Sequence, residues 1–515
     1  MTTSVKISAG ILFVVLLGVG GFTAYKVLST AVDNTNYLLK GDQYLSQQQY
    51  SNALTSYQKY EVKNPNDLST YQKIAKIDEL KNRFKDAIDS LKKGIDRSPT
   101  SGDLNFELGE DQSNLSATDT AYLQQSIDSY LLAAKSEKYK NIGTYKAARL
   151  FSQKADAVSL AKAKDLYISL GSFQPAKYEL VLYNLNDPDK ALSDLNVAQG
   201  IPVVSGQEDI STDFSSWSEF AKELSTQLNS VKQDINAKRS SATIDDSKGY
   251  VAYKLNRCEF GTEFLKAAII ESEKDVFYPQ ARLVLGECEK RLKQYSDAKA
   301  YVEPVLQKNS TSLDARLILR QIYKGLGDFV NMKKMYDELI SLDGQNFGTR
   351  LDYAQDLEFI QDYAGAAVQY AWLGQNLNEQ SIVAGSKNTN FSLNQKYLIR
   401  SYELFGYKAN DYIKATEVIQ TAIASNVKYI DTNISNELIA WANYQKNNSD
   451  KGLRDQALIQ AKNLQNTDAL YHVAVISKDT GDLLTAKSDA LKAYDTDDTG
   501  YIAPLAAAIV NETVK

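Results

Sequence analysis

The sequence contains very few residues of the kinds that perform catalysis or bind metal ions. It has one histidine, His472, and two cysteines, Cys258 and Cys288, with no CxxC motif or Cys/His cluster. A structural zinc site needs several such ligands at close spacing, so we expect no metal site. His472 lies inside a helical pattern, YHVAV, and a lone histidine in such a pattern is best interpreted as a core or rim residue.

The sequence also lacks recognisable catalytic motifs. It has no glycine-rich phosphate loop, GxSxG elbow or HExxH helix. Its many carboxylates follow helical patterns, in which acidic side chains usually face water. We therefore expect no enzyme and no cofactor. The net charge of −6 and the pI near 5.3, without a long basic run, disfavour a nucleic-acid partner as well.

The strongest pattern in the chain is a repeat with a step of 34 residues, which begins at Tyr278. Leu283, Leu317 and Leu351 fall in one register, and three more sets keep the same step: Tyr295, Phe329 and Tyr363; Ala298, Met332 and Ala366; Val302, Tyr336 and Tyr370. This period is typical of a two-helix repeat. One such unit cannot bury its apolar face alone, so the pattern predicts units stacked on one another.

The first unit, NYLLKGDQYLSQQQYSNALTSYQKYEVKNP, resembles the tetratricopeptide repeat (TPR) family. Small residues at Gly41 and Ala53 let two antiparallel helices approach, Tyr44 and Tyr57 fill the remaining space, and Pro65 ends the second helix. The resemblance implies an all-α fold, a TPR-like α-solenoid of antiparallel helix pairs. Arg320 departs from the family pattern, because it stands where a small residue is usual.

Breaks in the repeat pattern divide the chain. Residues 200 to 214, GIPVVSGQEDISTDF, show no helical period, and a longer helix follows them. The final stretch, IAPLAAAIV, is too short to cross a bilayer and suits a helix that covers the last unit. We predict these segments: a short tail (1–6), a transmembrane anchor (7–28), an N-terminal TPR-like array (32–199), a linker and long helix (200–246), a C-terminal TPR array (247–499) and a capping helix (500–515).

The anchor is predicted from 19 uncharged residues between Lys6 and Lys26. As a helix they would be roughly 28 Å long, close to the thickness of a bilayer's hydrocarbon core. The alternative is a cleaved signal peptide, whose apolar core is usually shorter. A short polar N-terminus before one apolar span favours a single-pass protein with a cytoplasmic N-terminus and an extracytoplasmic solenoid.

The TPR resemblance also implies a binding groove, since the first helices of successive units line the inner surface in that family. Leu283, Leu317 and Leu351 would repeat there, with Glu287, Gln321 and Gln355 one helical turn further on. Apolar side chains beside amide and acid groups can hold a protein or peptide segment. The alternative is that the leucines only seal contacts between helices.

The two cysteines fall on neighbouring antiparallel helices of this scheme. Cys258 should begin one unit's second helix, and Cys288 lies late in the next first helix. We expect a disulfide between them if the domain is exported, and buried thiols otherwise.

These features together predict a membrane-anchored TPR scaffold that mediates protein–protein interactions and recruits or organises cell-envelope or export partners. The alternative is a structural spacer or self-assembling solenoid without a dedicated peptide groove, which would form a homo-oligomer.

Overall fold

The structure is a computed structural model of the 515-residue chain. It describes residues 37–116, 119–202, 216–272, 277–377, 382–384, 390–427, 430–497 and 500–513, the side chains of 382–384, 390 and 391 excepted. The predicted anchor, 7–28, lies outside these ranges. Within them, no helix is both long and apolar enough to cross a membrane.

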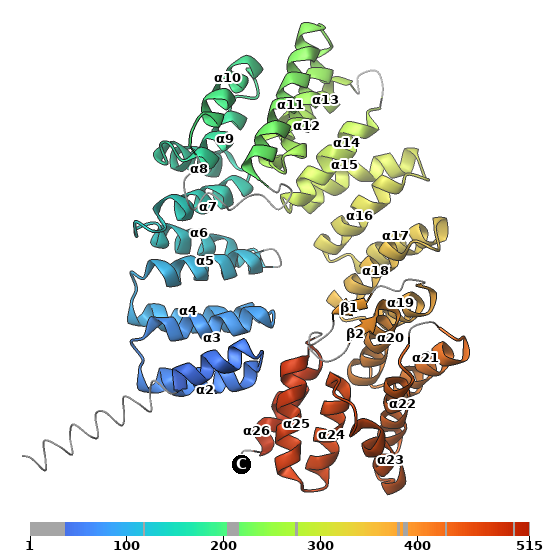
Figure 1. The fold of residues 1–515 in the computed structure, drawn as a ribbon. Helices are drawn as coiled ribbons and strands as arrows, with labels where there is room; N and C mark the ends of the chain where they lie inside the picture. The colour runs from blue at the N-terminus through green and yellow to red at the C-terminus, as the bar shows by residue number, and fades with distance from the viewer. Residues whose placement is uncertain are drawn as a thin grey trace, which may run out of the picture. The chain divides into compact units, whose positions relative to one another are not determined.

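The 34-residue period of the sequence is the period of the helices. The first helices α14 (Pro279–Arg291), α16 (Leu313–Leu326) and α18 (Phe347–Phe359) begin at positions that keep this step. So do the second helices α15 (Tyr295–Lys308), α17 (Phe329–Leu342) and α19 (Tyr363–Asn376). Each first helix packs against the second helix that follows it. The predicted TPR-like array of helix pairs is therefore confirmed (Figure 1).

The remaining helices continue the same alternation on both sides. Residues 37–46 are helical and precede the first numbered helix. The others are α2 (Tyr50–Lys63), α3 (Leu68–Leu80), α4 (Phe84–Arg97), α5 (Gly102–Ser116), α6 (Ala121–Ala133), α7 (Lys140–Gln153), α8 (Ala157–Ser169), α9 (Gln174–Leu182), α10 (Pro188–Gln199), α11 (Trp217–Asn236), α12 (Ser241–Lys254), η1 (Cys258–Phe260), α13 (Thr262–Ser272), α20 (Leu393–Glu403), η2 (Leu404–Lys408), α21 (Tyr412–Ala424), α22 (Thr432–Lys446), α23 (Lys451–Ala461), α24 (Thr467–Asp479), α25 (Leu483–Thr496) and α26 (Ile502–Thr513).

The turn inside each pair repeats as regularly as the helices do. Lys293, Gly327 and Gln361 are one period apart, and all three have a positive φ, of 62°, 71° and 62°. Only glycine adopts this conformation without a steric cost, so Lys293 and Gln361 are held there by the helices on either side. Asp328 then caps α17 by accepting a hydrogen bond from Asn331 N at 3.2 Å.

Small residues set the distance between the two helices of a pair. At Gly286 in α14, an added Cβ would lie 2.1 Å from Val302 Cγ2 in α15. The backbone of α14 is therefore in direct contact with a side chain of α15. The equivalent residue in α18 is Ala354, which is fully buried. The equivalent residue in α16 is Arg320. Its large side chain is accommodated because the guanidinium bonds to Tyr336 and Asp352.

By their contacts the residues form two compact units. Unit 1 takes its described residues from both ends of the chain, 37–115 and 461–513, and unit 2 takes those between 116 and 460. In unit 2 one buried core runs from Tyr145 through the long helix α11 to Leu255. The core thus contains the long helix of the predicted linker segment together with residues on both sides of that segment, and the predicted segment boundaries stay a prediction.

Two short strands interrupt the helices near residue 380. β1 (Ile382–Ala384) pairs antiparallel with β2 (Asn390–Ser392), with Val383 opposite Phe391. Three-residue strands give too short a period-two pattern to be recognised from sequence.

Candidate functional site

The six residues predicted to line a groove lie on three consecutive first helices of unit 2. We call them the first-helix face: Leu283 and Glu287 on α14, Leu317 and Gln321 on α16, and Leu351 and Gln355 on α18. All six lie outside the fully buried core. Leu317 is 37% exposed, whereas Leu283 and Leu351 are half-buried. The leucines therefore remain partly open to a partner, and the role of the face in binding stays a prediction.

Hydrogen bonds and ion pairs connect each first helix to the next one along this surface. Arg320 Nη2 donates to Asp352 Oδ2 at 2.7 Å, and Lys324 Nζ donates to Asp356 Oδ1 at 2.6 Å. Both pairs join α16 to α18, and both partners are separated by 32 residues. Lys290 of α14 donates in the same way to Gln321 of α16. These contacts hold the first helices in register.

The two cations in the last turn of α14, Lys290 and Arg291, are already paired with an acid of the same helix. The Glu287 carboxylate pairs with Lys290 Nζ at 2.7 Å and with Arg291 Nε at 3.1 Å. Burial lowers the pKa of the Lys290 ammonium, while Glu287 acts in the opposite direction. Glu287 therefore holds two basic groups in place and is not an unpaired acid awaiting a ligand.

Arg320 is supported by a second layer of polar groups. Its Nη1 donates to Tyr336 OH, and that hydroxyl donates to Asp356 Oδ2 at 2.6 Å. The ring of Tyr336 stacks on that of Tyr353, with centroids 4.5 Å apart. A buried guanidinium needs a counter-charge and hydrogen-bond partners. The network supplies both for Nη1 and Nη2, whereas Nε is buried and makes no hydrogen bond among the described residues, so an arginine can replace the usual small residue.

Sequence reasoning missed these polar partners. Their signal is a basic residue in one unit and an acid 32 residues later, as in Arg320 with Asp352. That spacing differs from the repeat period, so it does not appear when the units are aligned column by column. The resulting surface offers leucines and amide groups, with its described cations and acids paired to one another.

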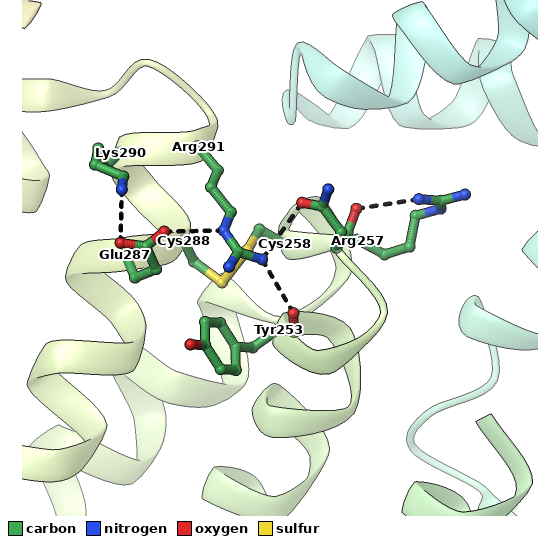
Figure 2. The surroundings of a disulfide bond; sticks show 8 residues. Tyr253, Arg257, Cys258, Glu287, Cys288, Lys290 and Arg291 are labelled. Carbon is green, nitrogen blue, oxygen red and sulfur yellow. Dashed lines mark hydrogen bonds and ion pairs between the residues drawn. A yellow bond between two sulfur atoms is a disulfide. The ribbon is translucent and has the colours of Figure 1, made fainter. Parts of the chain in front are cut away.

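A disulfide bond lies at the start of this array. Cys258 in η1 and Cys288 in α14 are bonded, with their Cα atoms 5.1 Å apart, and both are buried. Figure 2 shows Arg291 beside the bond, where its Nε donates to Glu287 and its Nη1 to the Tyr253 carbonyl at 3.2 Å. The bond joins the pair α12–α13 to α14, which is the connection that the sequence positions suggested.

The residues on either side of Cys258, Arg257 and Glu259, enter a largely buried ion network. Arg257 Nη2 donates to Glu179 Oε1 at 2.7 Å, and Arg149 Nη1 donates to Glu259 Oε1 at 2.6 Å. Tyr145 OH also donates to Glu179 Oε1, at 3.0 Å. Burial alone would raise the pKa of the Glu179 carboxyl, but the two arginines outweigh it and the pKa is lowered. The network joins α7 and α9 to the segment that carries the disulfide.

His472 in α24 is fully buried, as its position in the helical pattern indicated. Among the residues that the structure describes, no group of histidines, cysteines and acids is arranged to hold a metal ion.

No protein-family model matches the sequence, and neither does any curated protein. Solved structures of helical proteins match at low identity. A tetratricopeptide repeat protein from Parabacteroides merdae is 14% identical, over 53% of this chain and 99% of that chain, with a TM-score of 0.28. Yeast Tom70 is 12% identical, over 94% and 96%, with a TM-score of 0.28. Naa15/Naa10 bound to HypK-THB is 13% identical, over 94% and 96%, with a TM-score of 0.29. With TM-scores this low, the solved structures do not establish a fold or a function for this chain. The assignment of helix pairs depends on the 34-residue period and on the helices of the chain itself.

Proposed function

We propose that this protein is a membrane-anchored interaction scaffold whose first-helix face binds a segment of a partner protein. The observation that carries the proposal is the exposure of Leu317, midway between Leu283 and Leu351, on helices held in register by polar contacts. A residue that only sealed helix contacts would be buried, as Leu285 and Leu319 on the same helices are.

The chemistry of the face favours a partner with apolar side chains. The basic groups beside the leucines are paired with acids or amides of this chain, so a strongly charged segment gains little there. Gln355 is exposed and carries a donor and an acceptor suited to a peptide backbone, and the exposed Gln321, whose Oε1 accepts from Lys290, keeps its Nε2 donor. The face therefore suits an amphipathic helix or an extended segment with alternating apolar residues.

The anchor and the location belong to the same proposal. Residues 7–28 would tether the scaffold to a membrane, which raises its effective concentration toward partners at that surface. The Cys258–Cys288 bond supports an oxidising, extracytoplasmic location, because disulfides rarely persist in the cytosol. Cell-envelope or export proteins are the partners that such a location offers.

Leu317→Asp tests the binding face. The variant places a charge at the centre of the face without touching the core, so the fold should survive, as circular dichroism can verify. Val330→Asp is the matched control, since Val330 is 80% exposed on the second helix α17. In pull-downs from solubilised membranes, we expect Leu317→Asp to lose proteins that the parent and Val330→Asp retain. Identical captured sets for all three proteins would refute the assignment.

The location is tested separately by the state of the cysteines. We expect alkylation of the denatured, non-reduced protein from its native host to modify neither Cys258 nor Cys288. Two alkylated thiols would contradict an extracytoplasmic location. That result would not bear on the proposed role of the first-helix face, which is tested separately by Leu317→Asp.

A further inference from the structure

Unit 1 brings together residues that are more than 400 positions apart in the chain. The turn between α3 and α4 carries Lys81 and Arg83, and the carboxyl-terminal end of α25 carries Tyr494 and Asp495. Hydrogen bonds run directly between these two elements. They are distinct from the first-helix face, which lies in unit 2.

Lys81 binds the end of helix α25 through its ammonium group. Its Nζ donates to the carbonyl oxygens of Tyr494, Asp495 and Asp497 at 3.2, 3.1 and 3.1 Å. The last carbonyls of a helix lack partners within the helix and carry the negative end of its dipole. A lysine from elsewhere in the chain thus satisfies two of these groups, Tyr494 and Asp495, and also the carbonyl of Asp497, which follows the helix. The same ammonium lies 4.8 Å from the centroid of the Tyr50 ring, which adds a cation–π contact.

Two further contacts flank this lysine. Arg83 is held by an ion pair with Asp78, and its Nη1 donates to Tyr494 OH. On the other side, Ser51 N at the start of α2 donates to Asp495 Oδ1 at 2.8 Å. The backbone amide of a first helical turn has no partner within its helix, so the Asp495 carboxylate is well matched to it. The two surfaces are therefore complementary at three separate points.

An open, partly solvent-filled pocket lies beside the joint. A cavity of about 1030 Å³ lies beside these contacts, lined from one side by residues such as Gln47 and Asn82 and from the other by Leu491 and Pro504. A joint made of polar contacts around a cavity buries little apolar surface, and apolar burial is what makes an association hard to reverse. This joint can accordingly open without unfolding the helix pairs on either side.

We propose that Lys81, Arg83 and Ser51 form a docking surface whose partner is the end of helix α25 of the same chain. The two surfaces act as a reversible clasp between the first helix pairs and the last helices. Lys81 is its central contact, because it alone reaches three carbonyls at the end of α25.

The test measures energy transfer between two fluorophores in the full chain. They are attached to cysteines introduced by Gln47→Cys and Lys492→Cys, two exposed positions that line the same cavity. The native cysteines are bonded to each other and do not compete for the label. Lys81→Met keeps the length of the side chain and removes its charge, and Lys85→Met, at an exposed position of α4, is the matched control.

We expect high transfer in the parent and in Lys85→Met, and a ratio of closed to open molecules that falls about tenfold or more in Lys81→Met. The expected size follows from the loss of several hydrogen bonds made by a charged donor. Tyr494→Phe, which removes only the hydroxyl that Arg83 contacts, should give a smaller fall and serves as the second variant if Lys81→Met fails to fold.

Equal transfer in the parent and both clasp variants would overturn the proposal, as would low transfer in the parent. A mixture of chains labelled singly with donor or acceptor should show no transfer. Transfer in that mixture would assign the docking surface to a second copy of the chain and would also overturn the intramolecular clasp.

Discussion

Asp111 should make the stability of unit 1 depend on pH in the direction opposite to that of an ordinary carboxylate. It lies on α5 with only 2% of its surface exposed, and its Oδ2 has no hydrogen-bond partner among the described residues. Burial first, and then the neighbouring acids Glu79, Glu107 and Glu110, raise the pKa of its carboxyl to about 7, while Lys76 acts in the opposite direction. Asp111 is therefore protonated in the folded protein over a range in which the unfolded chain is ionised.

The sign follows from the number of bound protons. Between the unfolded pKa, about 3.9, and the folded pKa, the native state binds more protons than the unfolded state, so stability falls as the pH rises. A shift of about three pKa units corresponds to about 4 kcal/mol at most, and partial opening of the site to water reduces this figure. Below the unfolded pKa the carboxyl is neutral in both states and contributes no pH dependence to stability.

Asp111→Asn removes the ionisation and keeps the shape. The new amide has a fixed cost for any hydrogen bond left unmade, and that cost does not vary with pH. Relative to the parent, we expect the free energy of unfolding of Asp111→Asn to rise by about 2–4 kcal/mol between pH 4 and pH 8. Urea unfolding followed by circular dichroism at both values measures it.

Asp89→Asn on α4 is the matched control, since Asp89 is exposed. It should change the free energy of unfolding by less than about 0.5 kcal/mol at either pH. If the difference between Asp111→Asn and the parent is the same at pH 4 and pH 8, the carboxyl of Asp111 ionises normally and the reasoning is wrong. Glu107, whose pKa burial also raises, keeps some pH dependence in the variant and does not affect this comparison.

Two further substitutions test other parts of the fold by urea unfolding. Glu179→Gln leaves the buried Arg257 without a counter-charge, while Arg149 keeps Glu259, so the change should cost about 3–5 kcal/mol. Glu263→Gln, at an ion pair whose acid is 85% exposed, should cost less than about 1 kcal/mol. Equal losses would mean that the buried network contributes nothing particular. Gly286→Ala forces Val302 to move and should cost about 1–3 kcal/mol of stability. Its control is Gly348→Ala, which should be neutral or stabilising because the nearest atom to the new Cβ is 3.4 Å away. A neutral Gly286→Ala would show that α14 and α15 are not in close contact.

The helix pairs could be predicted because their causes are local and repeated. Apolar residues at helical spacing define the helices, and small residues such as Gly41 and Ala53 define where two helices approach; Ala53 is fully buried. The long helix expected from Ser216 is α11, which Ser216 caps through Glu219 N. Each of these features depends on residues within one or two units.

The clasp, the buried ion network and the polar contacts between first helices could not be predicted in this way. Lys81 has the same appearance in the sequence as any surface lysine, because its partners are backbone carbonyls of a helix near the other end of the chain. Glu179 and Arg257 are 78 residues apart and belong to no common motif. Every residue has a backbone carbonyl, so the sequence does not show which carbonyls accept a hydrogen bond from a distant side chain. Ion pairs whose members are not 34 residues apart also do not appear when the repeats are aligned.

Arg320 shows how these two kinds of information fit together. The repeat pattern identifies it as a departure, since Gly286 and Ala354 occupy the equivalent positions, but it cannot say what the departure does. In the structure its guanidinium reaches Tyr336 on the helix behind it and Asp352 on the next first helix, so one side chain fastens two contacts at once. The positive charge of Arg320 is paired with Asp352 and helps to hold the helices in register. Leu317, one turn earlier, stays exposed and can contact a partner. A departure from the pattern therefore strengthens the proposed face, by fixing its geometry and removing a free charge from it.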